Sequence, residues 1–276
     1  MRERPSDRSG YRWLALGEDM LPAEEQWLAP DEAATLAGLR YTKRRSEYLL
    51  RRLVTKHAVA AVTGRPIDLA TLVSIEVRNA ASGAPYVCVD GAPLGIEVSI
   101  TDRAGWAVCV TSPASGHPVA IASAAQPGAA GRHQGSRVGC DLELVEPRTP
   151  GFVRDFLTAA EQRLIASRTP GDERDMTANL VWSAKESALK VLRTGLRRDT
   201  RTLEVTLAAP RADGWGELTV HAVEGAEFPG WWRRDGRFLL TVAAEVAGPP
   251  PLALGDPTAL ALATPRHTWL DRPLYL

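Results

Sequence analysis

Two acidic residues, Asp141 and Glu143, are separated by one position in the apolar stretch VGCDLELVE. Side chains two residues apart on a β-strand point to the same face, so both carboxylates should project together. Adjacent like charges are costly there unless a cation lies between them, and Mg²⁺ prefers carboxylate oxygens. The pair therefore suggests a magnesium site, although a solvated strand face is the commoner reason for an isolated Asp-x-Glu.

A second group of reactive side chains follows in WSAKESALK, residues 182–190. Helical spacing puts Glu186 and Lys190 on one side and brings Lys185 next to the apolar side, an unusual place for one of only four lysines. Glu186 could complete the metal site or act as a base, beside a phosphate-binding lysine. A surface Glu–Lys pair four residues apart explains the same spacing more simply.

Residues 40–56 form a dense basic run that is relieved only by Glu47. On a helix, Arg45, Arg52 and Lys56 share one narrow stripe, which suits phosphate binding because arginine offers a fork and lysine a point charge. A solvated helix face is the ordinary explanation of such a run. Beside three carboxylates, in a chain with 33 basic and 33 acidic residues, it suggests a Mg²⁺-dependent enzyme acting on a polyphosphate.

The elements that must hold these side chains are predicted in the same order twice. A strand over 11–18, a helical stretch over 31–64 with one interruption and short strands after Pro66 come first. A second series then has a strand, two helices and three strands, at 138–146, 152–167, 178–195, 202–209, 216–224 and 236–246.

This order predicts an α+β protein of two similar halves that form a pseudodimer, each with a mainly antiparallel sheet and packed helices. We expect an N-terminal half over 1–122 and a C-terminal half over 138–276. Residues 123–137 would be a linker or insertion, because 112–136 is rich in Gly, Ala, Ser and Pro.

Composition excludes several classes of protein. In 276 residues, 45% are hydrophobic and 24% charged, which is enough for a core without disulfides. The cysteines occur singly, the first residues lack a secretory signal, and no run of 18 apolar residues could span a membrane. We therefore expect a cytoplasmic protein. Zero net charge and 6% aromatic residues argue against a protein that binds nucleic acid.

Together the two motifs resemble those of the 4′-phosphopantetheinyl transferases, in their two-halves, surfactin-synthetase-activating type. That family has an (I/V)-G-x-D-x-E strand followed by a (F/W)-(S/T/C)-x-K-E-(A/S)-x-x-K helix. Here they stand as VGCDLE at 138–143 and WSAKESALK at 182–190. The first half contributes RRSEYLLRRLVTKHAV, similar to the family's coenzyme A-binding helix, and SGAPY with SITDRAGWAVC, similar to its first-half strand motif.

The resemblance implies a holo-[carrier protein] synthase. Such an enzyme transfers the phosphopantetheine arm of coenzyme A to a serine of an apo acyl or peptidyl carrier protein, and releases adenosine 3′,5′-bisphosphate. By position, Asp141, Glu143 and Glu186 would hold Mg²⁺, and Glu186 would take the serine proton. Lys190, with Lys185 near it, would stabilise charge on the pyrophosphate. The family serves fatty-acid, polyketide and non-ribosomal peptide systems, and the chain could act as a monomer.

The resemblance also assigns coenzyme A phosphates to Arg45, Arg52 and Lys56. One position departs from the family, because many members carry Ser-x-Ser-His where this chain has Ser99-Ile100-Thr101-Asp102. An ionised aspartate cannot donate to phosphate, so that contact would pass to Ser99 or Arg103.

Three alternatives remain. A Mg²⁺-dependent phosphohydrolase or nucleotidyl transferase would use the same carboxylates, but the Trp-Ser-x-Lys-Glu context and the lack of a histidine in any motif disfavour it. A regulatory protein that binds nucleic acid through the 40–56 helix is disfavoured by composition. A catalytically degenerate coenzyme A-binding homologue is left open by Asp102. A P-loop enzyme is excluded because GxxxxGK[ST] is absent.

Overall fold

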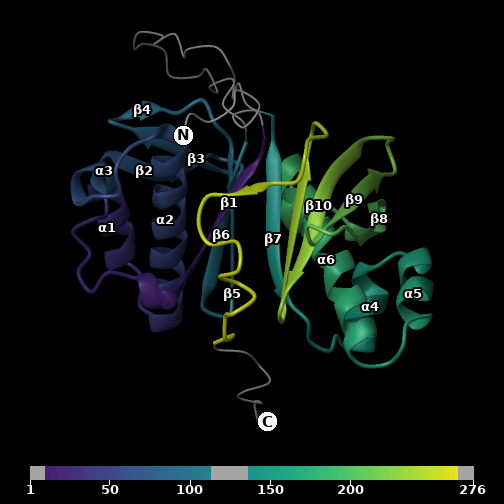
Figure 1. Ribbon diagram of the computed structural model, residues 1–276. Helices are drawn as coiled ribbons and strands as arrows, with labels where there is room; N and C mark the ends of the chain where they lie inside the picture. Colours follow the sequence, from purple (N-terminus) through teal and green to yellow (C-terminus); the bar gives the residue numbers. More distant parts are fainter. Residues whose placement is uncertain (1–9, 113–135, 267–276) are drawn as a thin grey trace.

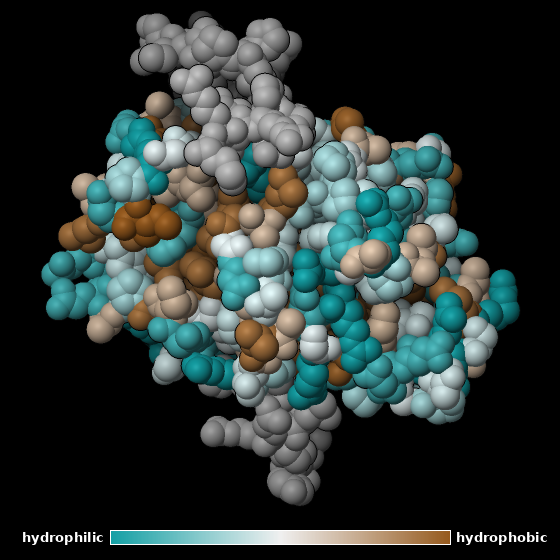
Figure 2. Space-filling model, viewed as in Figure 1, coloured by the Kyte–Doolittle hydropathy of each residue, from teal (hydrophilic) through white to brown (hydrophobic). Residues whose placement is uncertain are grey.

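The computed structural model describes residues 10–112 and 136–266. Figure 1 shows two mainly antiparallel sheets between two long helices, α2 (Thr42–Thr63) and α6 (Asp172–Leu192). The mixed α+β class predicted from the sequence is therefore confirmed. No helix among the described residues has the length and apolar run needed to cross a bilayer. Hydrophobic side chains on the face in Figure 2 lie in small groups among hydrophilic ones.

The first sheet has the strand order β12-β1-β6-β5. Its strands are β1 (Arg12–Gly17), β5 (Val98–Arg103), β6 (Trp106–Thr111) and β12 (Leu252–Ala253). Helix α2 packs on its outer face, and a small sheet lies beside it with the order β2-β3-β4. The remaining elements here are α1 (Pro30–Ala37), α3 (Leu69–Ser74), β2 (Ile75–Asn79), β3 (Pro85–Val89) and β4 (Ala92–Pro93).

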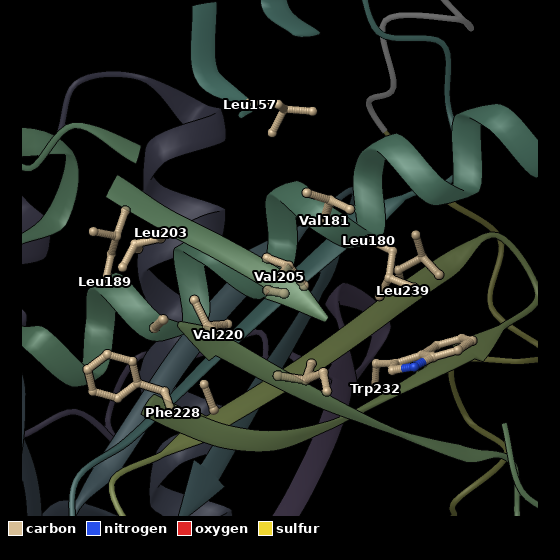
Figure 3. Packing of buried hydrophobic residues seen from close by; sticks show 14 of the residues in the cluster. Leu157, Leu180, Val181, Leu189, Leu203, Val205, Val220, Phe228, Trp232 and Leu239 are labelled. Atoms are coloured by element: carbon tan, nitrogen blue, oxygen red, sulfur yellow. The ribbon is translucent and has the colours of Figure 1, made fainter. Parts of the chain in front are cut away.

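The second sheet has the antiparallel order β7-β11-β10-β9-β8. Its strands are β7 (Val138–Leu144), β8 (Leu203–Pro210), β9 (Trp215–Ala222), β10 (Glu227–Asp235) and β11 (Phe238–Ala244). Helix α6 covers its outer face through the apolar cluster in Figure 3, with α4 (Pro150–Phe156) and α5 (Ala159–Ala166) beside it. A second apolar cluster fills the space between the two sheets.

Strand β7 has both faces buried, and its alternation decides where the acidic side chains point. Cys140 and Leu142 belong to the cluster between the sheets. Asp141 and Glu143 therefore face the other way, toward α6. Gly139 lies on that same face, where a Cβ would be only 1.9 Å from the Ser187 carbonyl oxygen. The glycine of the motif is thus what lets α6 approach the strand.

The two sheets also meet at their edge strands, β5 and β7. The Ser99 hydroxyl accepts a hydrogen bond from the Cys140 N–H at 2.8 Å, and the Thr101 hydroxyl accepts one from the Leu142 N–H at 3.1 Å. Side-chain hydroxyls therefore occupy the place of main-chain partners along this seam.

A buried ion pair ties α1 to α2. Glu32, the third residue of α1, accepts hydrogen bonds from the Ala29 and Val77 N–H groups. Its carboxylate lies 2.6 Å from the Lys56 ammonium, which also donates to the Trp27 carbonyl. Lys56 is fully buried and Glu32 nearly so, so every charge here is matched inside the protein.

The same set of contacts recurs between α5 and α6. Glu161, the third residue of α5, accepts from the Thr158 and Val205 N–H groups. Its carboxylate lies 2.6 Å from the fully buried Lys185 ammonium, which donates to the Phe156 carbonyl. In both pairs the lysine follows its glutamate by 24 positions. Lys56 also donates to the Leu72 carbonyl and Lys185 to the Thr200 carbonyl. Each of these carbonyls lies five residues before the strand residue, Val77 or Val205, whose N–H donates to the glutamate.

Several element predictions need correction. The single helix predicted over 152–167 is two helices, because Leu157 and Thr158 adopt extended backbone and Thr158 caps α5. The sequence analysis does not predict strand β10, which carries two tryptophans. Residues 69–74, which follow Pro66 where only short strands are predicted, form the helix α3. The tail after Gly248, which the predicted division includes in the C-terminal half, returns to the first sheet as β12. Most of the predicted linker lies outside the described residues.

Candidate active site

Asp141 on β7 and Lys190 on α6 form the centre of the candidate site. The Lys190 ammonium lies 3.0 Å from one Asp141 oxygen and donates to the Cys140 carbonyl at 2.7 Å. Ser183 donates to the other Asp141 oxygen at 3.0 Å. Burial, the largest single effect, would lower the pKa of Lys190, but the groups around it, Asp141 first and then Cys140 and Glu186, together outweigh burial and raise the pKa. Lys190 is therefore a fixed cation, and 31% of its side chain is open to solvent.

Glu186 lies one helical turn before Lys190. Its carboxyl group forms no hydrogen bond or ion pair with any side chain or main-chain group within residues 10–112 and 136–266. Burial, and then the charge of Asp141, raise its pKa to about 7, against the opposing effect of Lys190. A half-buried carboxyl group without a partner, titrating near neutral pH, suits a proton acceptor or a cation ligand.

Glu143 faces α6 beside Asp141 but is held by arginines. Arg103 from β5 lies 3.3 Å from one of its oxygens and also contacts Glu146. Arg148 lies 3.0 Å from the other oxygen and donates to Asn179. We call Arg103, Glu143, Glu146 and Arg148 the arginine–glutamate cluster. Sequence inspection missed Glu146 and Arg148, which lie just beyond β7.

The three carboxylates predicted to bind metal are brought to one region but not into one coordination shell. Among the described residues no three His, Cys, Asp or Glu side chains are grouped closely enough to hold an ion. Glu143 is paired instead with two arginines of the arginine–glutamate cluster, Arg103 and Arg148. The donor chemistry still fits a hard cation, because Glu186 is unpaired and one buried oxygen of Glu143 lacks a hydrogen bond.

Lys190 also lines a cleft of about 250 Å³. Ser99 of β5, residues 82–85 around the start of β3, two arginines, Arg137 and Arg193, and one carboxylate, Glu97, also line it. Arg193 is held by both oxygens of Glu97, at 2.9 and 2.7 Å. The cleft thus joins the first-half strand motif to the C-terminal end of α6.

The predicted phosphate stripe on α2 faces away from this cleft. Arg45 donates to the Leu36 carbonyl and pairs with Glu25. Arg52 is buried, 3.6 Å from Glu32, and lies over the Tyr48 ring. Lys56 is enclosed by the same glutamate. All three residues pack toward α1, because the opposite side of α2 carries the apolar residues that cover the first sheet. All three side chains are therefore engaged by acidic groups of the protein itself, and none of them lines the cleft that contains Lys190.

Lys185, predicted to act beside Lys190, is likewise enclosed. Its ammonium is saturated by Glu161 and two carbonyls in the apolar interior. We therefore assign it a structural role. The sequence indicates this burial, because helical spacing places Lys185 at the edge of the apolar side of the helix.

Two other cations of α2, Arg51 and Lys43, lie toward the β5 edge of the first sheet. Arg51 pairs with Asp102, the residue at the position where the resemblance would place a histidine. Lys43 lines a cavity of about 80 Å³ together with Asp102 and Arg103. The aspartate is thus engaged by a cation from the basic helix, and it lies next to Arg103.

Comparison with known proteins adds an independent finding. Residues 137–243 match the model of the 4′-phosphopantetheinyl transferase superfamily. No curated protein matches the chain.

Two solved structures are similar over part of the chain. One is a holo-(acyl-carrier-protein) synthase from Bacillus anthracis str. Ames in complex with CoA (3′,5′-ADP), at 22% identity and a TM-score of 0.32, covering 37% of this chain and 93% of that one. The other is the holo-[acyl-carrier-protein] synthase of Thermotoga maritima, at 25% identity and a TM-score of 0.31, covering 39% of this chain and 61% of that one.

Proposed function

We propose, from the membership of residues 137–243 in the 4′-phosphopantetheinyl transferase superfamily, that this chain transfers the phosphopantetheine arm of coenzyme A to an apo carrier protein. The acceptor would be a serine of an acyl or peptidyl carrier protein. Its oxygen forms a bond to the β-phosphorus of coenzyme A while the phosphoanhydride bond breaks. Adenosine 3′,5′-bisphosphate leaves, and the serine proton passes to a base.

The observation that carries this proposal is the unpaired carboxyl group of Glu186 beside the Asp141–Lys190 pair. A base should be poised near the working pH, and a pKa of about 7 meets that condition. Lys190, fixed 3.0 Å from Asp141 and partly exposed, can stabilise negative charge on the leaving phosphate. Ser183 and Thr101 hold the Asp141 carboxylate in place.

Asp141 and Glu186, with Glu143, are the residues that would hold Mg²⁺. The ion would neutralise charge on the pyrophosphate while the phosphoanhydride breaks. These residues offer only carboxylate oxygens, the donors that magnesium selects.

We place coenzyme A in the cleft of about 250 Å³ lined by Ser99, Lys190, Arg137 and Arg193. Three cations and one carboxylate, Glu97, line this cleft, so its wall carries an excess of positive charge that suits phosphates. Ser99 keeps its hydroxyl proton available for a ligand, because it accepts rather than donates at the β5–β7 seam. Arg103, the other residue that the resemblance offers for this phosphate contact, belongs to the arginine–glutamate cluster.

We further propose that the chain is a pseudodimer of two related halves and acts as a monomer. The repeated Glu–Lys pairs support this, because chance would not reproduce the same capping position, spacing and carbonyl partners. Only the second copy has an acidic residue after the buried lysine, since His57 follows Lys56 where Glu186 follows Lys185. The three free, buried cysteines suit a reducing compartment such as the cytoplasm.

The test is intact-protein mass spectrometry of several apo carrier proteins incubated with this protein, coenzyme A and Mg²⁺. Fatty-acid, polyketide and non-ribosomal peptide carriers would be compared. We expect a gain of one phosphopantetheine mass that is lost with EDTA and reduced at least about 100-fold in Glu186→Gln. Arg45→Gln, on the outer stripe, is the matched control and should retain the activity.

The outcomes separate the alternatives. Coenzyme A binding without transfer to any carrier would contradict the transferase and favour a degenerate homologue. Release of free phosphate from coenzyme A or nucleotides, without a mass gain on the carrier, would favour a phosphohydrolase.

A further inference from the structure

The arginine–glutamate cluster joins the two sheets at one of the proposed metal ligands. Arg103 comes from the end of β5 in the first sheet, whereas Glu143 and Glu146 belong to β7 and the turn after it. Arg103 contacts both carboxylates, and its side chain is only 28% exposed. The Arg103 guanidinium group therefore lies beside the Glu143 oxygen that is not paired with Arg148.

The pairing at Glu143 is incomplete. The Arg103 Nε and the nearest Glu143 oxygen are 3.3 Å apart, but both atoms lack a hydrogen bond among the described residues. Arg148 likewise approaches the other oxygen at 3.0 Å without forming one. Charges that attract without good hydrogen bonds recover only part of the free energy lost on burial. Glu143 is thus the weakly held member of the cluster.

Arg103 has a second anchor that Glu143 does not share. Its other nitrogen donates to Glu146, a nearly buried carboxylate. Arg103 also borders the cavity of about 80 Å³ beside Asp102 and Lys43, which gives its side chain space to shift. It can therefore leave Glu143 without becoming an unpaired buried charge.

We propose that Arg103 is a built-in counter-ion that competes with the divalent metal for Glu143. Without metal, Arg103 bridges Glu143 and Glu146. When the metal binds with Asp141 and Glu186, Glu143 turns to it and Arg103 remains on Glu146. This inference rests on the proposed function, because it concerns the same metal site, and it gives the first half a direct influence on metal affinity.

The experiment is a titration of the full chain with Mn²⁺ as a probe for Mg²⁺, without coenzyme A, following free Mn²⁺ by electron paramagnetic resonance. Removing the competitor in Arg103→Gln should tighten Mn²⁺ binding by about three- to tenfold. Arg103→Lys keeps a positive charge but loses the fork, so its affinity should lie between the two. Circular dichroism would establish that each variant is folded.

Arg233→Gln is the control, because Arg233 forms a comparable partly buried pair with Asp235 on the second sheet and touches none of these carboxylates. Its Mn²⁺ affinity should equal that of the unmodified chain. Equal or weaker binding in Arg103→Gln would overturn the competition while leaving the metal site intact. Absence of Mn²⁺ binding in the unmodified chain and every variant would overturn the metal site itself, and the inference with it.

Discussion

At the scale of residues, position along the helix matters less than what surrounds each charged group. Lys185, Glu186 and Lys190 lie on one helix within six positions, yet one is enclosed, one is unpaired and one is fixed beside Asp141. The buried ammonium of Lys185 is neutralised by Glu161, whereas Glu186 forms no ion pair among the described residues. The negative charges of Asp141 and Glu143 raise its pKa, and the charge of Lys190 opposes them. The local electrostatics thus assign chemistry to Glu186 and structure to Lys185.

Glu186 should make the stability of the metal-free protein depend on pH. Its pKa is about 7 in the folded protein against 4.5 for an ordinary glutamate, so the folded state holds the proton more tightly. The stability this provides is complete below about pH 4.5 and is lost as the pH rises through 7. Glu186→Gln should therefore be more stable than the unmodified chain at pH 8, by roughly 1–3 kcal/mol.

Thermal unfolding of both proteins in EDTA, from pH 5 to pH 8, measures this difference. The gap in melting temperature should widen with pH. A gap that is constant across the range would mean that Glu186 titrates normally.

At the scale of elements, α6 is aligned by a close approach to β7 and by its buried lysine. Gly139 permits the approach, since any side chain there would meet the Ser187 carbonyl. Lys185 fixes the rotation of the helix about its axis. Because Glu186 is the next residue, that rotation also determines where its carboxylate lies.

Gly139→Ala should be strongly destabilising because a Cβ only 1.9 Å from backbone oxygen forces the helix off the strand. We expect a loss of at least about 3 kcal/mol in chemical denaturation. Gly151→Ala is the control, since its nearest neighbour is the flexible end of Arg154 at 3.6 Å. Unchanged stability in Gly139→Ala would show that the helix can move away freely.

The two buried Glu–Lys pairs should respond alike to mutation. Lys56→Met and Lys185→Met each leave a glutamate buried without its cation, at a cost of about 3–5 kcal/mol. Adding Glu32→Gln or Glu161→Gln to the matching variant should recover part of that loss. Urea denaturation of the single and double variants measures the coupling. Additive effects within either pair would contradict the ion pair.

At the scale of the whole molecule, the two main sheets are held together by the apolar cluster between them, the β5–β7 seam and the returning tail. Leu252 and Leu254 donate main-chain hydrogen bonds to the Tyr11 and Trp13 carbonyls. Leu260 is fully buried in the cluster between the sheets. The tail therefore helps to hold the two sheets together, although in the sequence it follows the strands of the second sheet.

Leu260→Ala should lower the free energy of unfolding by about 2–4 kcal/mol, because it opens a cavity at this joint. Leu262, two residues further, is 80% exposed, so Leu262→Ala should change stability by less than about 0.5 kcal/mol. Guanidinium denaturation of the two variants gives the comparison. Equal effects would mean that the tail does not pack as described.

The sequence by itself determined the α+β class and the strand–helix pair that carries Asp141, Glu143, Glu186 and Lys190, and it contained the motifs within residues 137–243 that match the transferase superfamily model. These follow from short-range spacing, which fixes the faces of a strand and a helix. It could not identify which charged residues are enclosed. Arg45, Arg52 and Lys56 form a regular stripe, but only the packing of α1 and the segment before it decides that their charges are paired within the protein.

Tertiary structure also decided what meets Glu143 and where the tail ends. Arg103 is 40 positions away in the sequence, and β12 is more than 200 positions from its partner β1. Contacts at such separation depend on how the two sheets dock, and their docking is set by the apolar cluster between them. The pattern of charges along one helix does not indicate how the two sheets dock. The contacts around the site are therefore set only by the tertiary structure.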